Sequence, residues 1–197
     1  MSGGTAERTG GSAVRARRIP GEPWVWGLFA ADLAMFTAFF ISFAVDRQRN
    51  LDVFAESQRT LYQGLALSNT LLILVSSFMV AVGLQSVRAG ARHAPRAFYV
   101  ALGCGAAFAI VKVVEWSLLI HAGYRGSNQF FVYYFTITGL HFTQLCGGLV
   151  ILAFLAARAT RSADGGGPGK LFESGCGFWH LVDLLWLIMF SLFYLAP

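Results

Sequence analysis

Five long runs of apolar residues dominate the chain, and the short segments between them hold most of its charges. The runs fall at about 24–45, 64–87, 97–120, 130–156 and 176–196. Each reaches the roughly 20 residues that a helix needs to cross a membrane. Because a helix satisfies its backbone hydrogen bonds internally, it is the form that such a segment takes in lipid. The pattern predicts an all-α membrane protein, a bundle of five transmembrane helices.

The same pattern divides the chain into two parts. Residues 1–19 are rich in Gly, Ser, Thr and Arg and show no hydrophobic periodicity, so we expect a disordered cytoplasmic tail there. Residues 20–197 are predicted to form the transmembrane domain. The first apolar run is too long for a typical signal-peptide core and contains Asp32. We therefore predict that it is retained as the first membrane helix.

Composition supports a membrane protein and narrows the classes of function. The 197 residues are 56% hydrophobic and only 13% charged, whereas soluble domains carry about 25% charged residues. The net charge of +5 does not indicate nucleic-acid binding, because basic residues gather in the cytoplasmic loops of membrane proteins. Neither a disulfide framework nor a zinc site is expected from three scattered cysteines without a CxxC pair, namely Cys104, Cys146 and Cys176.

The distribution of Lys and Arg predicts the orientation of the bundle. If the N-terminus is inside, ten of these residues lie in inner segments and four in outer segments, with Lys112 within a span. Since cytoplasmic loops are enriched in Lys and Arg, we expect the N-terminus inside and the C-terminus outside. Small residues along the spans further predict close helix packing, among them Gly83, Gly103, Gly105, Gly139, Gly147 and Gly148.

Ionisable residues inside the spans are the candidate functional residues, because each costs about 2.5–3.5 kcal/mol at the membrane centre. At about 1.5 Å per residue, Asp32 lies roughly 12 Å from the inner end of the first span. Asp183 lies roughly 10 Å from the inner end of the fifth, with His180 about one turn shallower. We expect these three in one layer, with Asp32 and Asp183 on neighbouring helix faces. Asp32 has no partner on its own helix, so it must be protonated or reach another span.

Two further polar groups lie in the third and fourth spans, one in the outer half of the membrane and one near its middle. Lys112 and Glu115 are three residues apart in the third span and can form an ion pair on one helix face. His141 lies near mid-depth in the fourth span, with Gln144 three residues further on. Each of these groups can be a packing contact or a proton-handling site, since burial raises carboxyl pKa values toward neutrality and the imidazole pKa is ordinarily close to it.

Other functions remain open at this point. His141 and His180 stand on different helices, as the axial ligands of a membrane cytochrome do. A stand-alone haem or quinone oxidoreductase and a small proton-coupled transporter are therefore the alternatives to a subunit without chemistry of its own. No nucleophile elbow, phosphate loop or metal-spaced cluster is found in the sequence.

An ordered set of short stretches resembles subunit III of the haem–copper oxidases, over about residues 20–197. The stretches are Pro20-Gly21-Glu22-Pro23-Trp24-Val25-Trp26, Phe29-Ala30-Ala31-Asp32, Ser68-Asn69-Thr70, Lys112-Val113-Val114-Glu115-Trp116, Thr138-Gly139-Leu140-His141 and Trp179-His180-Leu181-Val182-Asp183-Leu184-Leu185-Trp186.

The resemblance implies a non-catalytic subunit of the respiratory chain in the bacterial inner membrane. Such a subunit packs against a catalytic subunit, which alone holds the haem and copper, and supports its assembly, stability and proton uptake. Bound phospholipid is also implied. The branch it resembles is the short five-helix one that includes NorE-type proteins of nitric oxide reductase clusters. Longer members have two further N-terminal helices. At the position of Asp32 they usually carry Glu preceded by Ser, whereas Asp32 is preceded by Ala31 here.

Overall fold

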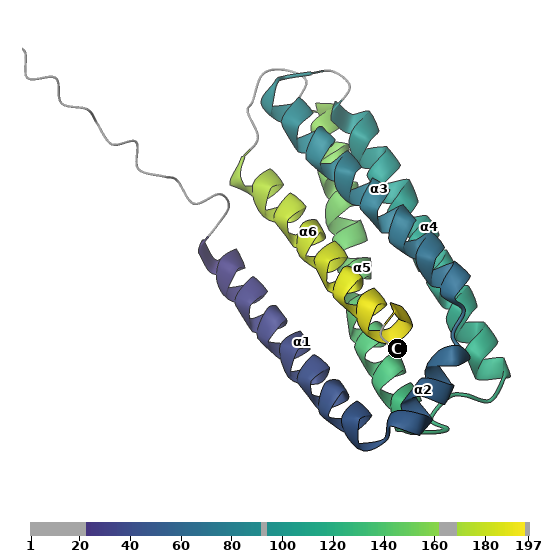
Figure 1. Cartoon of the computed structure of the whole chain (residues 1–197). Helices are drawn as coiled ribbons and strands as arrows, with labels where there is room; N and C mark the ends of the chain where they lie inside the picture. Colours follow the sequence, from purple (N-terminus) through teal and green to yellow (C-terminus); the bar gives the residue numbers. More distant parts are fainter. Residues whose placement is uncertain (1–22, 92–93, 162–168, 196–197) are drawn as a thin grey trace, which may run out of the picture.

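The computed structural model describes residues 23–91, 94–161 and 169–195, and within them every regular element is helical (Figure 1). The elements are α1 (Pro23–Arg49), α2 (Leu51–Arg59), α3 (Gln63–Arg88), α4 (Ala94–His121), α5 (Gln129–Arg161), α6 (Lys170–Phe190) and the short π-helical segment η1 (Ser191–Leu195). The predicted tail, residues 1–19, lies outside the described residues.

Five helices in the described part of the chain are long and apolar enough to cross a membrane: α1, α3, α4, α5, and α6 continued by η1. The predicted bundle of five spanning helices is therefore confirmed. Several helices run past the predicted spans; α5, for example, extends from Gln129 to Arg161. The difference arises because an apolar run marks only the part of a helix that lies in hydrocarbon.

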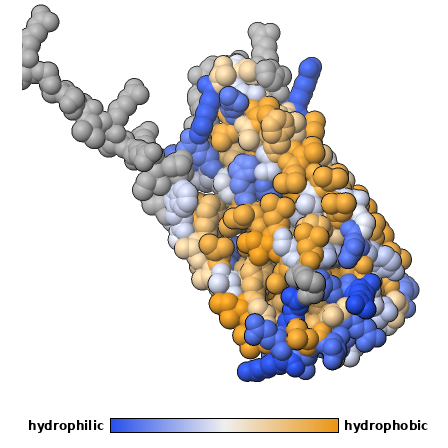
Figure 2. Space-filling model, viewed as in Figure 1, coloured by the Kyte–Doolittle hydropathy of each residue, from blue (hydrophilic) through white to orange (hydrophobic). Residues whose placement is uncertain are grey.

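The bundle consists of α3 to α6, with α1 along one side (Figure 1). Helix α3 packs against α4 and α6, α5 packs against α4 and α6, and α1 lies against α5 and α6. Only 11% of the apolar stretch of α1 is buried within the chain, against 33–44% for the other four. Figure 2 shows hydrophobic surface over the middle of the molecule, with hydrophilic residues gathered chiefly at its two ends.

Helix α2 is an element that the sequence analysis did not predict. Its nine residues are too few to span a membrane, and an apolar-run criterion passes over them. One side of α2 is nevertheless buried, through Phe54, Ser57 and Gln58. The ring of Phe54 packs 5.3 Å from Phe43 of α1 and 5.7 Å from Phe130 of α5, so α2 closes this end of the bundle.

Two glycines let a tryptophan of α6 lie between its neighbours. A Cβ atom at Gly105 of α4 or Gly148 of α5 would come within 2.8 Å of the Trp179 ring, which is completely buried. The close packing predicted at these positions and at Gly83 is confirmed. The prediction of close packing between described helices is wrong at three glycines where an added Cβ atom would meet no other part of the chain within 4 Å, namely Gly103, Gly139 and Gly147.

Candidate functional site

The buried pair Lys112 and Glu115 on α4 forms the centre of the largest polar cluster. Their charged groups are 3.0 Å apart, and their side chains are 2% and 0% exposed. The predicted ion pair on one helix face is present. A charged pair so fully withdrawn from water is stable only when further hydrogen bonds satisfy its remaining atoms.

Two tyrosines supply those hydrogen bonds. Tyr134 comes from α5 and Tyr194 from η1, near the end of the described chain. Lys112 Nζ donates to the Tyr134 hydroxyl at 3.0 Å and to the Tyr194 hydroxyl at 3.1 Å. Both hydroxyls donate in turn to Oε1 of Glu115, at 3.0 Å and 2.6 Å. We call these four residues the Lys–Glu–Tyr cluster.

Every hydrogen that the polar groups of this cluster can donate is used. The three ammonium hydrogens of Lys112 go to Glu115 and the two hydroxyls, and each hydroxyl gives its one hydrogen to the carboxylate. The Lys112 ammonium also lies 5.0 Å from the ring centroid of Trp186, in a cation–π contact. The cluster joins three separate elements, so it holds α4, α5 and η1 together.

Sequence reasoning missed Tyr134 and Tyr194. The available signal was their position inside apolar runs, because a buried tyrosine hydroxyl usually has a hydrogen-bond partner. Nothing in the sequence, however, shows which charged pair these hydroxyls reach. That information comes only from the packing of η1 and α5 against α4.

His180 and Asp183 form a second polar group, between α6 and α3. Nδ1 of His180 shares a hydrogen bond of 2.8 Å with the Ser77 hydroxyl of α3 and lies 3.4 Å from Oδ2 of Asp183. The side chain of His180 is 41% exposed and that of Asp183 8% exposed. Oδ1 of Asp183 is buried and has no hydrogen-bond partner among the described residues.

Asp32 reaches another span, which is one of the two outcomes expected for it. Nε2 of Gln144 on α5 donates to Oδ1 of Asp32, while Oδ2 of Asp32 is buried and unpartnered within the described part of the chain. No described hydrogen bond joins Asp32 to His180 or Asp183. The expected grouping of these three residues in one layer therefore stays a prediction about depth.

His141 is buried at 2% exposure between aromatic rings. Its Nε2 lies 3.1 Å from the carbonyl oxygen of Val182 on α6, and since a carbonyl oxygen only accepts, Nε2 is the donor. His141 and His180 thus each use a ring nitrogen inside the protein, in different contacts. This arrangement favours helix packing over joint ligation of a haem.

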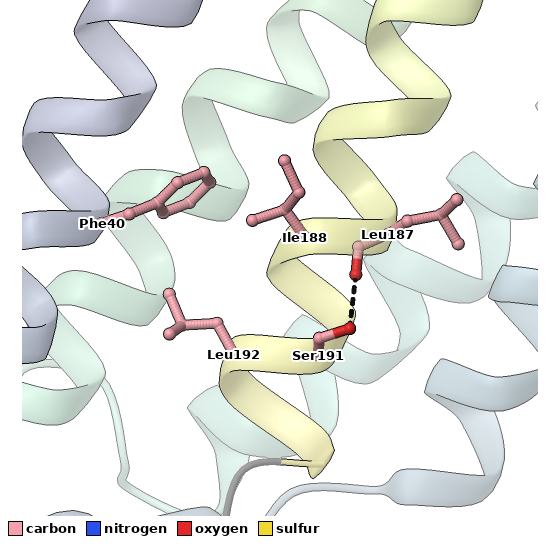
Figure 3. Close-up of a pocket in the computed structure, with 5 residues that line it drawn as sticks. All are labelled: Phe40, Leu187, Ile188, Ser191 and Leu192. Carbon is pink, nitrogen blue, oxygen red and sulfur yellow. Dashed lines mark hydrogen bonds between the residues drawn. The ribbon is translucent and has the colours of Figure 1, made fainter.

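An apolar groove of about 480 Å³ lies between α1 and the C-terminal part of α6 with η1 (Figure 3). Phe40 of α1 faces it from one side, and Leu187, Ile188, Ser191 and Leu192 line the other. The hydroxyl of Ser191 donates to the carbonyl oxygen of Leu187 at 3.0 Å, so it needs no partner in the groove. The groove is suited to a hydrocarbon chain and not to a polar ligand.

Comparison with protein families gives a match over nearly the whole described chain. The model of the family described as "Cytochrome c oxidase subunit III" matches residues 28–196.

Curated relatives agree with this match. The "Probable cytochrome c oxidase subunit 3" of Mycobacterium leprae is 28% identical over 173 residues, covering 86% of this chain and 84% of the relative. The protein of the same description from Nocardia farcinica is 26% identical, over 96% and 98% of the two chains. The "Cytochrome bo(3) ubiquinol oxidase subunit 3" of Pseudomonas aeruginosa is 26% identical, over 86% and 82%.

Proposed function

Since this chain belongs to the cytochrome c oxidase subunit III family, we propose that it stabilises the catalytic subunit of its oxidase without carrying out chemistry itself. It is a multi-pass protein of the bacterial cytoplasmic membrane and subunit III of a haem–copper oxidase. Its work is to support assembly, sustained turnover and proton uptake of the catalytic subunit, which holds the haem and copper.

The observation that best supports a stabilising role is the Lys–Glu–Tyr cluster. All its donor hydrogens are used within the chain, so none is left to bind a substrate. A fully satisfied buried network fixes one arrangement of the helices that it joins. The chain thereby presents a rigid surface to the larger subunit.

A supporting role in proton uptake belongs to the other polar groups. Asp32 and Asp183 each keep one buried carboxylate oxygen without a hydrogen-bond partner among the described residues. Such atoms are sites for buried water, and a water bound there can pass a proton to or from the carboxylate. These two acids, with His180 beside Asp183, are the residues that we assign to proton handling.

The groove between α1 and α6 is the place where we expect a phospholipid. It lies between two spanning helices, beside the C-terminal part of α6, and is lined almost entirely by apolar side chains. An acyl chain of the surrounding membrane fits this chemistry. Mass spectrometry of the complex released from native membranes tests it: substitution of Ile188 by Trp should lower the amount of retained phospholipid, whereas substitution of Val150, which is 71% exposed on α5, should not.

The orientation with the N-terminus inside and the position of the chain in the short, NorE-like branch are part of the same proposal. The five spans and the near-complete coverage of the Nocardia relative support a short branch. Deletion of the gene, followed by separate assays of oxygen and nitric oxide consumption, tells which acceptor the complex uses.

Copurification tests the function directly. The tagged chain, extracted in mild detergent from cells with an active oxidase, should recover a haem-containing partner. The variant Asp183→Ala should lower the yield or the sustained activity of the complex while its haem content per catalytic subunit stays constant. Repeated recovery of the chain alone, or loss of haem from the assembled Asp183→Ala enzyme, would overturn the proposal.

A further inference from the structure

His180 differs from most of the ionisable residues in the middle of the described spans, because its side chain is open to the surroundings; Asp32 is also partly exposed but is bonded to Gln144. Its side chain is 41% exposed, whereas Lys112, Glu115, His141 and Asp183 are all buried. Figure 2 shows a small hydrophilic area interrupting the hydrophobic surface in the region of α6. A polar side chain on a membrane-facing surface requires a physical explanation.

The imidazole ring cannot withdraw into the bundle. Its Nδ1 is held by the Ser77 hydroxyl at 2.8 Å and lies 3.4 Å from the Asp183 carboxylate. These two contacts fix the inward side of the ring. The described structure gives Nε2, the other ring nitrogen, no hydrogen bond, so the ring keeps one strong donor or acceptor directed away from these partners.

The depth of His180 separates Nε2 from water on both sides. Helix α6 begins six residues before the predicted apolar run, and His180 is hydrogen-bonded to Ser77 near the middle of α3. Ser77 is fourteen residues from Gln63 and eleven from Arg88, the ends of that span, which is about 21 Å and about 17 Å at 1.5 Å per residue. A long Lys or Arg side chain near a helix end can reach the headgroups. An imidazole at this depth is too short to do so. Lipid tails offer it no hydrogen bond.

The surface around His180 is apolar and suited to another helix. Leu184, one turn along α6 from His180, is 50% exposed. On α3, Leu74 and Phe78 flank Ser77 and are 43% and 62% exposed. A polar side chain surrounded by apolar ones is the arrangement by which membrane helices pack together and are held by a hydrogen bond between them.

We propose that the seam between α3 and α6 at His180 is the contact surface for a transmembrane helix of another subunit of the oxidase. That helix carries a side chain able to hydrogen-bond with Nε2 of His180 near the middle of the membrane. The neighbouring residues Leu74, Phe78 and Leu184 supply the apolar part of the contact. The inference rests on the proposed function in one respect: the partner is a subunit of the same respiratory complex.

Photo-crosslinking in native membranes tests this contact. Leu184 is replaced by p-benzoylphenylalanine, which leaves His180, Ser77 and Asp183 unchanged. The same replacement at Val150, 71% exposed on α5, is the matched control. After irradiation, position 184 should give a covalent adduct with another membrane subunit at least fivefold more abundant than position 150. Equal adducts from both positions, or only lipid adducts or adducts with a second copy of this chain, would overturn the inference.

Variants of the histidine test the hydrogen bond. We expect His180→Leu to lower the yield of this adduct at least threefold, and His180→Gln, which keeps a donor and an acceptor, to retain more than half of it. Ser77→Ala removes the inward hydrogen bond only and should have the smaller effect. If Ser77→Ala and His180→Leu are equally damaging, the outward nitrogen has no role.

The two proposals fail in different ways. Haem recovered with the tagged chain measures the proposed function in the same membranes. Haem recovered without an adduct from position 184 overturns the contact surface alone. Absence of haem from the purified material overturns the proposed function, whatever position 184 gives.

Discussion

Lys112 shows at the scale of one residue what a charge requires inside a membrane. Its ammonium group has three hydrogen-bond acceptors at 3.0–3.1 Å, one of them the carboxylate of Glu115. Loss of one partner from a buried ion pair leaves the other charge uncompensated, which costs about 3–5 kcal/mol. The two members of the pair are therefore strongly coupled in their effect on stability.

The variant Lys112→Met should consequently lower the free energy of unfolding by about 3–5 kcal/mol, measured by SDS titration in mixed micelles. The double variant Lys112→Met/Glu115→Gln has no buried charge and still accepts hydrogen bonds from the tyrosines. It should be more stable than Lys112→Met by at least about 1.5 kcal/mol. The single variant Glu115→Gln completes the comparison. If the losses of Lys112→Met and Glu115→Gln add up to the loss of the double variant to within about 0.5 kcal/mol, the two residues are not coupled.

Gly148 and Gly147 are neighbours in sequence with opposite surroundings. A Cβ atom at Gly148 would meet the Trp179 ring at 2.8 Å, and one at Gly147 would meet nothing within 4 Å. Gly148→Ala should therefore destabilise the chain by about 1–3 kcal/mol through overpacking. Gly147→Ala should be neutral or stabilise it by up to about 1 kcal/mol. Thermal unfolding in detergent measures the stability of both variants. Equal changes in the two would contradict the packing of Trp179 against Gly148.

At the scale of elements, α1 is held by a few contacts and not by extensive burial. Near its middle, Asp32 accepts a hydrogen bond from Gln144 of α5. Near its end, Oδ2 of Asp46 accepts hydrogen bonds of 2.6 Å from both Gln129 and Tyr133. The remaining sides of α1 face the surroundings, so the polar contacts have a large share in fixing its position.

Removal of one of these contacts should loosen the end of α1. We expect Asp46→Ala to raise hydrogen exchange in the segment from the last turn of α1 through α2, because two hydrogen bonds to α5 are lost. Hydrogen–deuterium exchange in micelles, read by mass spectrometry, measures this. Glu56→Ala changes an exposed carboxylate on α2 and should leave the exchange unaltered. An equal increase in both variants would show that Asp46 does not fix α1.

At the scale of the whole molecule, the charge distribution predicts the topology. Reporter fusions to alkaline phosphatase, which is active only outside the cytoplasm, test it. A fusion at Thr60, between α2 and α3, should be active, and one at Gly90, between α3 and α4, should be inactive. The prediction follows from the ten inner and four outer Lys and Arg residues. The reverse pattern of activity would show that the bundle is inserted the other way.

The five spans were predictable because each is a long apolar run, a signal contained within a single segment. The pair Lys112–Glu115 was predictable for a similar reason, since its spacing along one helix determines its contact. The partners of Asp32 and His180 were not, because Gln144 lies 112 residues from Asp32 and Ser77 lies 103 residues from His180. Contacts at that separation depend on how the helices are arranged around one another, which the pattern of one span does not contain.

The position of Tyr194 has a consequence for biosynthesis. It lies 82 residues after Lys112, so a growing chain inserts its charged third span long before the last hydroxyl of the cluster exists. During that interval Lys112 and Glu115 each lack at least one hydrogen bond. A product terminated just before Tyr194 would keep nearly all of its five spans and still resemble this unfinished intermediate. Membrane quality-control proteases that recognise unsatisfied polar groups in the bilayer thus have a means of distinguishing a completed subunit from a shortened one.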